Sequence, residues 1–223
     1  MNPQVPKLTI HPSAWISSSA VMTGTVIVEE NVYVSDGVMI VAEEAPVHIE
    51  KGSVIMENVI LKSSQDKNNT FPLLIKENTL IGPHAYLVGC TVEKNSFLAG
   101  GTKIHTGTYI GQHSMIGLNA VVHIDTNVKP KTVIPTHHIA FGNPMKIYPP
   151  TKSTEKMIAK IESSHYLDTL FQAENKNKSL TYKAVMEKYR QMLFDCKSTD
   201  IIKNLSLKEV HSTEINKRLN GGT

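Results

Sequence analysis

Residues 92–134 read VEKNSFLAGGTKIHTGTYIGQHSMIGLNAVVHIDTNVKPKTVI, and every sixth position holds a branched or long aliphatic residue. These positions are Val92, Leu98, Ile104, Ile110, Ile116, Val122, Val128 and Ile134. Two residues before each one stands a small or β-branched residue such as Thr102 or Ser114. Residues two apart share a face in an extended chain, so both columns point inward together. A helix would repeat at three- and four-residue steps, so the pattern predicts stacked strands, a parallel β-helix of six-residue units.

The same period runs upstream, from Ile10 to Ile40 and again from Ile49 to Leu87. Three units close a triangular coil of about eighteen residues, and successive coils stack ~4.8 Å apart. We therefore expect an all-β solenoid domain over residues 1–150. The polar stretch SSQDKNNTFP at residues 63–72 interrupts the period, so it should protrude as a loop. Such a loop either borders a binding site or is a neutral insertion.

After residue 150 the sixfold pattern stops and helix signals begin. Ser153 or Thr154 can cap a first helix. A second helix is expected over residues 180–194, where Val185, Tyr189 and Met192 contribute to an apolar stripe. The sequence therefore predicts an α-helical C-terminal extension over residues 151–223, packed on the last coils or on a neighbouring subunit.

Composition narrows the functional classes. The net charge of the chain is only +3. Nucleic-acid binding usually requires a dense face of Lys and Arg side chains, so no nucleic-acid partner is expected. The two cysteines, Cys90 and Cys196, lie far apart and suggest neither a disulfide framework nor a cysteine zinc site. The N-terminus lacks a signal-peptide pattern, and no segment has the length and apolarity of a membrane span. We expect a cytoplasmic protein without a membrane partner.

Several segments carry a family resemblance: AEEAPVHIEKG at 42–52, IGPHAYLVGC at 81–90, NAVVHI at 119–124 and GNPMKIYPP at 142–150. Together with the sixfold repeat they resemble the hexapeptide-repeat superfamily, which includes the γ-class carbonic anhydrases and many acyltransferases. The resemblance covers roughly residues 8–150. It implies a left-handed coil and a homotrimer with active sites between subunits.

The zinc site of the γ-class enzymes does not carry over. The positions that resemble its three histidine ligands hold Lys62, Pro83 and Val88, and those that resemble its arginine and glutamine hold Val41 and Met56. None of the first three can bind zinc as imidazole does. We therefore do not expect this protein to hydrate CO₂ at that site.

Two histidines continue the outward column in which the family places ligands. The column follows each inward aliphatic residue on one face and reads Val41, Lys62, Val88, His105, His123. His105 and His123 are one coil apart, so their side chains should be neighbours at about strand spacing. They either hydrogen-bond across a subunit interface, act as acid and base, or bind a metal. A metal would need His84, which lies at another corner and could approach the column of a neighbouring subunit.

Four polar residues complete the candidate site. Asp125 either orients the ring of His123 or serves as a turn residue. Lys62 either binds an anionic group or fills the place of the missing metal. Asn119 and His84 are taken with Lys62 as candidate substrate-binding residues, and Asn119 is also a turn former.

These residues support three functional hypotheses. The first is an acyltransferase that uses a coenzyme A thioester as co-substrate and acts on a small molecule, with His123, or else His105, as general base. The second is a metal-dependent hydratase or hydrolase with a relocated site formed by His84, His105 and His123. The third is a trimeric scaffold without catalytic activity. The segment Gly142–Lys146 resembles an ending common in the superfamily, which adjoins the coenzyme A groove in its acyltransferases and also occurs in relatives that are not acyltransferases. Because the usual zinc ligands are missing, coenzyme A is preferred to zinc.

Overall fold

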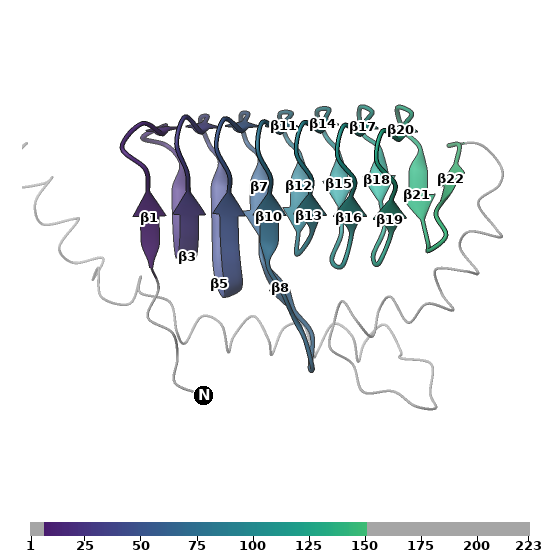
Figure 1. Ribbon diagram of the computed structural model, residues 1–223, viewed down its shortest axis with the longest axis horizontal. Helices are drawn as coiled ribbons and strands as arrows, with labels where there is room; N and C mark the ends of the chain where they lie inside the picture. The colour runs from purple at the N-terminus through teal and green to yellow at the C-terminus, as the bar shows by residue number, and fades with distance from the viewer. Residues whose placement is uncertain (1–6, 151–223) are drawn as a thin grey trace, which may run out of the picture. The chain divides into compact units, whose positions relative to one another are not determined.

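The computed structural model describes residues 7–150 of the 223-residue chain, apart from the side chains of Glu43 and Glu44. Every regular element in this range is a β-strand, and the strands wind into a solenoid of stacked coils (Figure 1). The expected all-β parallel β-helix is thus confirmed. The helical extension expected over residues 151–223 lies outside the described residues.

Each coil has three sides, and strands of successive coils pair in parallel along each side. The first face holds β1 (Leu8–Ile10), the second halves of β3 (Val21–Val28) and β5 (Met39–Ile49), β10 (Leu73–Ile75), β13 (Thr91–Val92), β16 (Tyr109–Ile110) and β19 (Asn127–Val128). The second face holds the first halves of β3 and β5, β7 (Ile60–Lys62), β12 (Tyr86–Val88), β15 (Lys103–Ile104), β18 (Val121–Val122) and β21 (Ile139–Phe141). The third face holds β2 (Trp15–Ile16), β4 (Tyr33–Val34), β6 (Val54–Ile55), β11 (Leu80–Ile81), β14 (Phe97–Leu98), β17 (Met115–Ile116) and β20 (Val133–Ile134). Finally, β22 (Lys146–Tyr148) pairs antiparallel with β21.

The inward columns form the core. On the second face Ile104 pairs in register with Leu87 below and Val122 above, and all three are fully buried. Most of the second, small column is also buried, and several of its hydroxyl groups donate to backbone carbonyls, although the buried Thr102 Oγ1 has no hydrogen-bond partner within the described residues. Thr108 Oγ1 donates to the carbonyl of His123 at 3.0 Å, and Ser114 Oγ donates to that of Lys129 at 3.2 Å. Thr108 and Ser114 are therefore tolerated inside this narrow coil because backbone carbonyls of the coil accept their hydroxyl groups.

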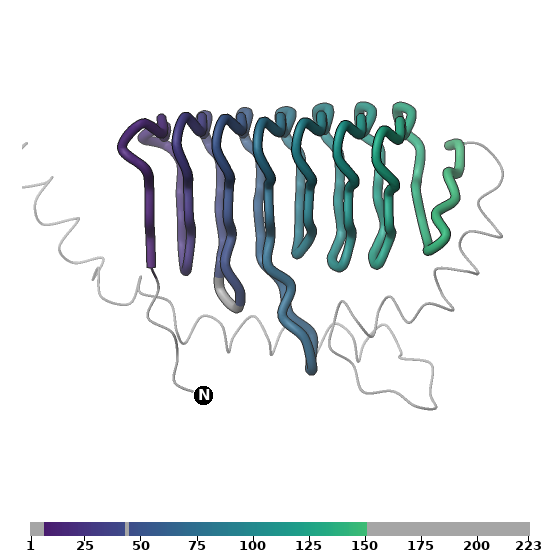
Figure 2. Tube along the Cα trace, in the orientation of Figure 1, coloured from purple at the N-terminus to yellow at the C-terminus, as the bar shows by residue number. Residues whose placement is uncertain are grey.

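The interruption at residues 63–72 is a short β-hairpin rather than an irregular loop. Strands β8 (Ser64–Gln65) and β9 (Thr70–Phe71) pair antiparallel. The carboxylate of Asp66 stabilises the turn of the hairpin, because it accepts hydrogen bonds from the backbone N–H groups of Asn68 at 2.8 Å and Asn69 at 2.7 Å. Figure 2 shows this hairpin extending beyond the line of the other coils. The expected protrusion is therefore present, and its local order comes from an aspartate that caps its own turn.

Candidate functional site

The histidine corner, as we name it, is the edge where the second face turns into the first. It consists of Lys62, Val88, His105, His123 and Phe141, each directly after an inward residue of the second face. Lys62 pairs with Val88 in the strand register. The backbone N–H of His105 donates to the carbonyl of Val122 at 3.0 Å, and that of His123 to the carbonyl of Ala140 at 2.9 Å. The column therefore has the order that the sixfold repeat predicts.

The two imidazoles are neighbours. Their ring centroids lie 5.8 Å apart, with the planes tilted by 36°. The ring of His123 also meets Phe141 edge to face, at 4.8 Å between centroids. His123 is only 7% exposed, whereas His105 is half-buried. Phe141 carries no acid–base or metal-binding group and is therefore not among the site residues predicted from the sequence, although it follows Ala140 just as His123 follows Val122.

Both histidines are shifted toward the neutral form. Burial lowers the pKa of His123 to about 4, and the neighbouring His105 adds to the shift. Burial also lowers the pKa of His105, together with the positive charge of Lys103. A neutral imidazole can accept a proton, so at neutral pH both rings are in the state that a general base needs.

The shift at His123 predicts a loss of stability in acid. Between pH 6.5 and 4 the unfolded chain binds a proton at this histidine that the folded chain excludes, so the free energy of unfolding falls as the pH falls. The full loss, reached below pH 4, is about 3 kcal/mol. In His123→Phe, which keeps a ring against Phe141, the loss over this interval should be smaller by that amount.

Urea unfolding of both proteins at pH 7, 6, 5 and 4 measures the effect. Other groups titrate in the same range, but they are common to both proteins and cancel in the difference between the two profiles. Parallel profiles for His123→Phe and the unsubstituted chain would contradict a buried, neutral His123.

Asp125 and Asn119 both occupy turns. Each has a positive φ, 50° for Asp125 and 54° for Asn119. Their side-chain oxygens lie over glycines of the preceding coil, Asp125 Oδ1 over Gly107 and Asn119 Oδ1 over Gly101, where a Cβ would collide with them. The turn role considered for Asp125 is thus present, and its orientation of His123 stays a prediction.

His84 and Asn119 share the corner between the third and second faces, at the opposite end of the second-face strands from His105. His84 is exposed at a turn with a φ of 58°. One subunit therefore does not bring His84 to the histidine pair. Within residues 7–150, no three His, Cys, Asp or Glu side chains cluster in a way that could hold a metal ion. Lys62, half-buried, lies in the histidine corner itself, two positions before His105 in the column.

The hairpin β8–β9 packs beside the histidine corner. A Cβ on Gly89 would lie 2.8 Å from the Cβ of Phe71 and 2.9 Å from that of Ser64, so only glycine lets the hairpin approach here. Thr106, next to His105, donates from Oγ1 to Ser64 Oγ at 3.4 Å. Burial and the negative charge of Asp66 in the hairpin raise the pKa of Asp125. The protruding segment therefore forms one wall of this corner.

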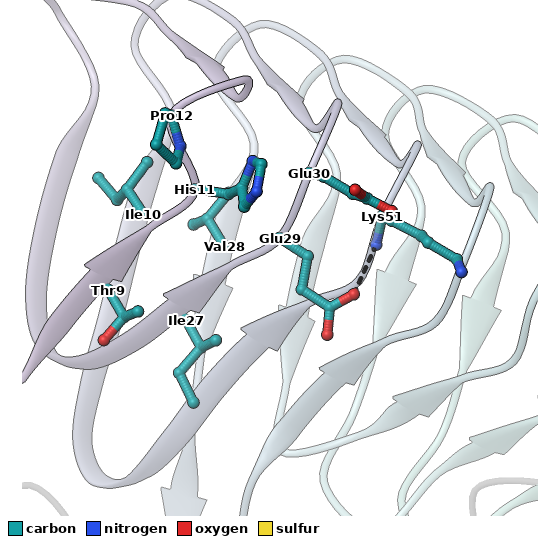
Figure 3. A pocket seen from close by; sticks show the side chains of 9 residues that line it. All are labelled: Thr9, Ile10, His11, Pro12, Ile27, Val28, Glu29, Glu30 and Lys51. Carbon is teal, nitrogen blue, oxygen red and sulfur yellow. Dashed lines mark hydrogen bonds between the residues drawn. The ribbon is translucent and has the colours of Figure 1, made fainter.

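A pocket lies elsewhere, on the first coils (Figure 3). It is lined by Thr9, Ile10, His11, Pro12, Ile27, Val28, Glu29, Glu30 and Lys51. The carboxylate of Glu29 accepts from the backbone N–H of Lys51 at 3.1 Å and contacts His48 Nε2 at 2.8 Å. This carboxylate is thus already engaged by the protein, and none of the candidate residues from the sequence lines the pocket.

No family model matches the chain. Over 157 residues it is 27% identical to the mitochondrial γ carbonic anhydrase 1 of Arabidopsis thaliana, a match covering 70% of this chain and 54% of that protein. Over 113 residues it is 28% identical to the carnitine operon protein CaiE of Salmonella agona, covering 51% and 55%. The chain thus spans about half the length of the curated relatives it matches.

Solved structures with similar coils include two acetyltransferases. A variant of perosamine N-acetyltransferase from Caulobacter crescentus, in complex with CoA and GDP-perosamine, is 26% identical with a TM-score of 0.37, covering 62% of this chain and 54% of that chain. A putative acetyltransferase from Bacillus cereus is 21% identical with a TM-score of 0.36, covering 75% and 92%. In the part of the chain that the structure describes, no helix is long and apolar enough to cross a membrane.

Proposed function

We propose that this chain, a hexapeptide-repeat β-helix protein, transfers an acyl group from a coenzyme A thioester to a small hydroxyl or amine acceptor at the histidine corner. The observation that carries the proposal is the pair of adjacent imidazoles, His105 and His123, both with lowered pKa values. The pair lies in the same outward column as Lys62 and Val88, which pair in the strand register and stand at positions that resemble two zinc ligands of the γ-class enzymes. The corner would be completed by a neighbouring subunit in a homotrimer.

His105 is the better general base of the two. A catalytic base works best when its pKa lies near the working pH, and a pKa of about 4 makes His123 a weak one. His105 is also the more exposed ring, so an acceptor can reach it from solvent. Buried between His105 and Phe141, His123 is then a positioning residue that holds the imidazole of His105 in place.

The reaction needs one base and no protein nucleophile. His105 removes a proton from the acceptor as its oxygen or nitrogen attacks the thioester carbonyl carbon. The tetrahedral intermediate then collapses and breaks the carbon–sulfur bond, and the protonated His105 returns the proton to the leaving thiolate. Burial raises the pKa of Cys90, the one cysteine within residues 7–150, so this thiol is not suited to a covalent acyl intermediate.

The first test is binding and turnover of acetyl-coenzyme A. We expect acetyl-coenzyme A to raise the Tm of the full chain, and thiol release to follow when hydroxyl and amine acceptors are supplied. His105→Gln should lower kcat by roughly 10²–10⁴-fold with little change in the KM for acetyl-coenzyme A. His123→Gln should lower kcat less and shift the pH profile, because it changes the surroundings of the base.

His113→Asn is the matched control. His113 is an exposed histidine at a turn with a φ of 60°, which asparagine also adopts, and it lies outside the histidine corner. Its activity should equal that of the unsubstituted chain. Absence of any Tm shift with acetyl-coenzyme A, or full turnover in His105→Gln, would overturn the proposal.

A further inference from the structure

The third face carries an unbroken apolar ladder on its outer side. Its seven members are Trp15, Tyr33, Val54, Leu80, Phe97, Met115 and Val133, one from each strand of this face. Each is paired in register with the next. Five members are between 40% and 60% exposed, namely Trp15, Tyr33, Phe97, Met115 and Val133. Isolated exposed apolar residues are ordinary, but a continuous row along a whole face marks an interaction surface.

The ladder lacks charge along its length. The outward position after each inward residue of this face is also uncharged; these positions hold Ser17, Ser35, Met56, Gly82, Ala99, Gly117 and Pro135. The ladder is ~29 Å long at the usual strand spacing. An occupant must therefore present an apolar surface over that length.

We propose that the third face binds the third face of a second copy of this chain. Two symmetry-related faces meet these requirements without further assumptions, because an isologous interface pairs a surface with itself. The exposed parts of the ladder amount to on the order of 500 Å² of apolar surface per copy. Two copies thus bring together ~1,000 Å², the size at which specific association begins, before the small flanking residues are added.

The order of large and small side chains along the ladder favours one relative orientation of the two copies. With the two-fold axis in the plane of the interface, perpendicular to the solenoid axis and centred on Leu80, the two solenoids run antiparallel and each large residue meets a smaller one. Trp15 faces Val133, Tyr33 faces Met115, Val54 faces Phe97, and Leu80 faces its own copy. With the axis along the solenoid, Trp15 would face Trp15 and Val133 would face Val133, leaving a wedge-shaped gap. Close packing therefore favours the antiparallel dimer.

This interface leaves the histidine corner free. The corner joins the second and first faces, so in a three-sided coil it lies opposite the third face. The inference is therefore independent of the acyl-transfer proposal and compatible with assembly at the corner. The full assembly then contains an even number of copies, two from the third face alone or six if trimers also form.

The test is native mass spectrometry of the full chain, with Met115→Lys as the disrupting variant and Tyr109→Lys as its control. Met115 lies in the ladder at 49% exposure, and Tyr109 lies on the first face at 40%. We expect an even number of copies that is halved in Met115→Lys and unchanged in Tyr109→Lys, with equal far-UV circular dichroism for all three. Trp15 is the single tryptophan, so its emission should shift to the red in Met115→Lys only.

Cross-linking checks the symmetry, with Cys196→Ser as background because Cys90 is buried. A short bismaleimide should couple Leu80→Cys into dimers and leave Val133→Cys uncoupled. Coupling of Val133→Cys would overturn the antiparallel arrangement. A monomer, or an assembly whose copy number Met115→Lys leaves unchanged, would overturn the interface. Binding to phosphatidylcholine vesicles that Met115→Lys abolishes would also overturn it, by assigning the ladder to a lipid surface.

Discussion

Ile104→Asp should leave no folded protein at 25 °C. Ile104 is fully buried in the narrow coil between Leu87 and Val122, where a carboxylate finds neither water nor a counter-charge. Burying an unpaired charge costs more than most point substitutions, and the total stability of a domain is only ~5–15 kcal/mol. Far-UV circular dichroism and size-exclusion chromatography of the purified variant measure the outcome, as unfolded or aggregated chain.

Two controls separate charge from position. Lys103→Asp puts the same carboxylate one residue earlier in β15, on an exposed outward position, and should fold normally. Ile104→Val keeps the site apolar and should cost only about 0.5–1.5 kcal/mol. A cooperative transition for Ile104→Asp within a few degrees of the unsubstituted chain would show that Ile104 does not point inward.

Gly82→Ala should remove a large part of the stability of the solenoid. A Cβ at Gly82 would lie 2.6 Å from the backbone N of Gly100, 2.7 Å from the carbonyl carbon of Ala99 and 2.9 Å from the carbonyl oxygen of Leu98. These atoms belong to the next coil, so they cannot move away without breaking the strand spacing. We expect a loss of about 3 kcal/mol or more, at the upper end of what overpacking costs. Chemical denaturation with urea measures it.

Gly100→Ala is the matched control. Its Cβ would meet nothing nearer than the carbonyl oxygen of Pro83 at 3.2 Å, followed by side-chain atoms of the same proline. A small adjustment accommodates that contact, so the variant should lose far less stability than Gly82→Ala. Equal stability of the two variants would mean that the coils do not approach as closely at Gly82 as the structure has them.

Most of the fold follows from the sequence because the solenoid is a local repeat. Each six-residue unit places one aliphatic residue and one small residue inward, and the same contact recurs in every coil. The series through Ile104 thus predicts the register with Leu87 and Val122 directly. It also predicts the outward column, and with it the adjacency of His105 and His123.

Other features of the site depend on contacts that the repeat does not encode. Ser64 and Phe71 lie against Gly89 only because the chain leaves the coil for ten residues and folds back, which no periodicity describes. Phe141 packs edge to face against His123. It follows Ala140, where the inward series has alanine in place of a larger aliphatic residue. The preference for His105 over His123 as base depends on burial, which is a property of the packed corner.

The amino-acid sequence by itself determined the six-residue period, the inward columns and the neighbouring histidines. These are consequences of residue spacing, because in a regular coil sequence distance converts directly into position. Only the tertiary structure decided that a hairpin walls the histidine corner, that His123 is buried against Phe141, and that the ladder from Trp15 to Val133 is exposed. Burial and exposure depend on what else packs nearby, and that information is spread over the whole folded chain.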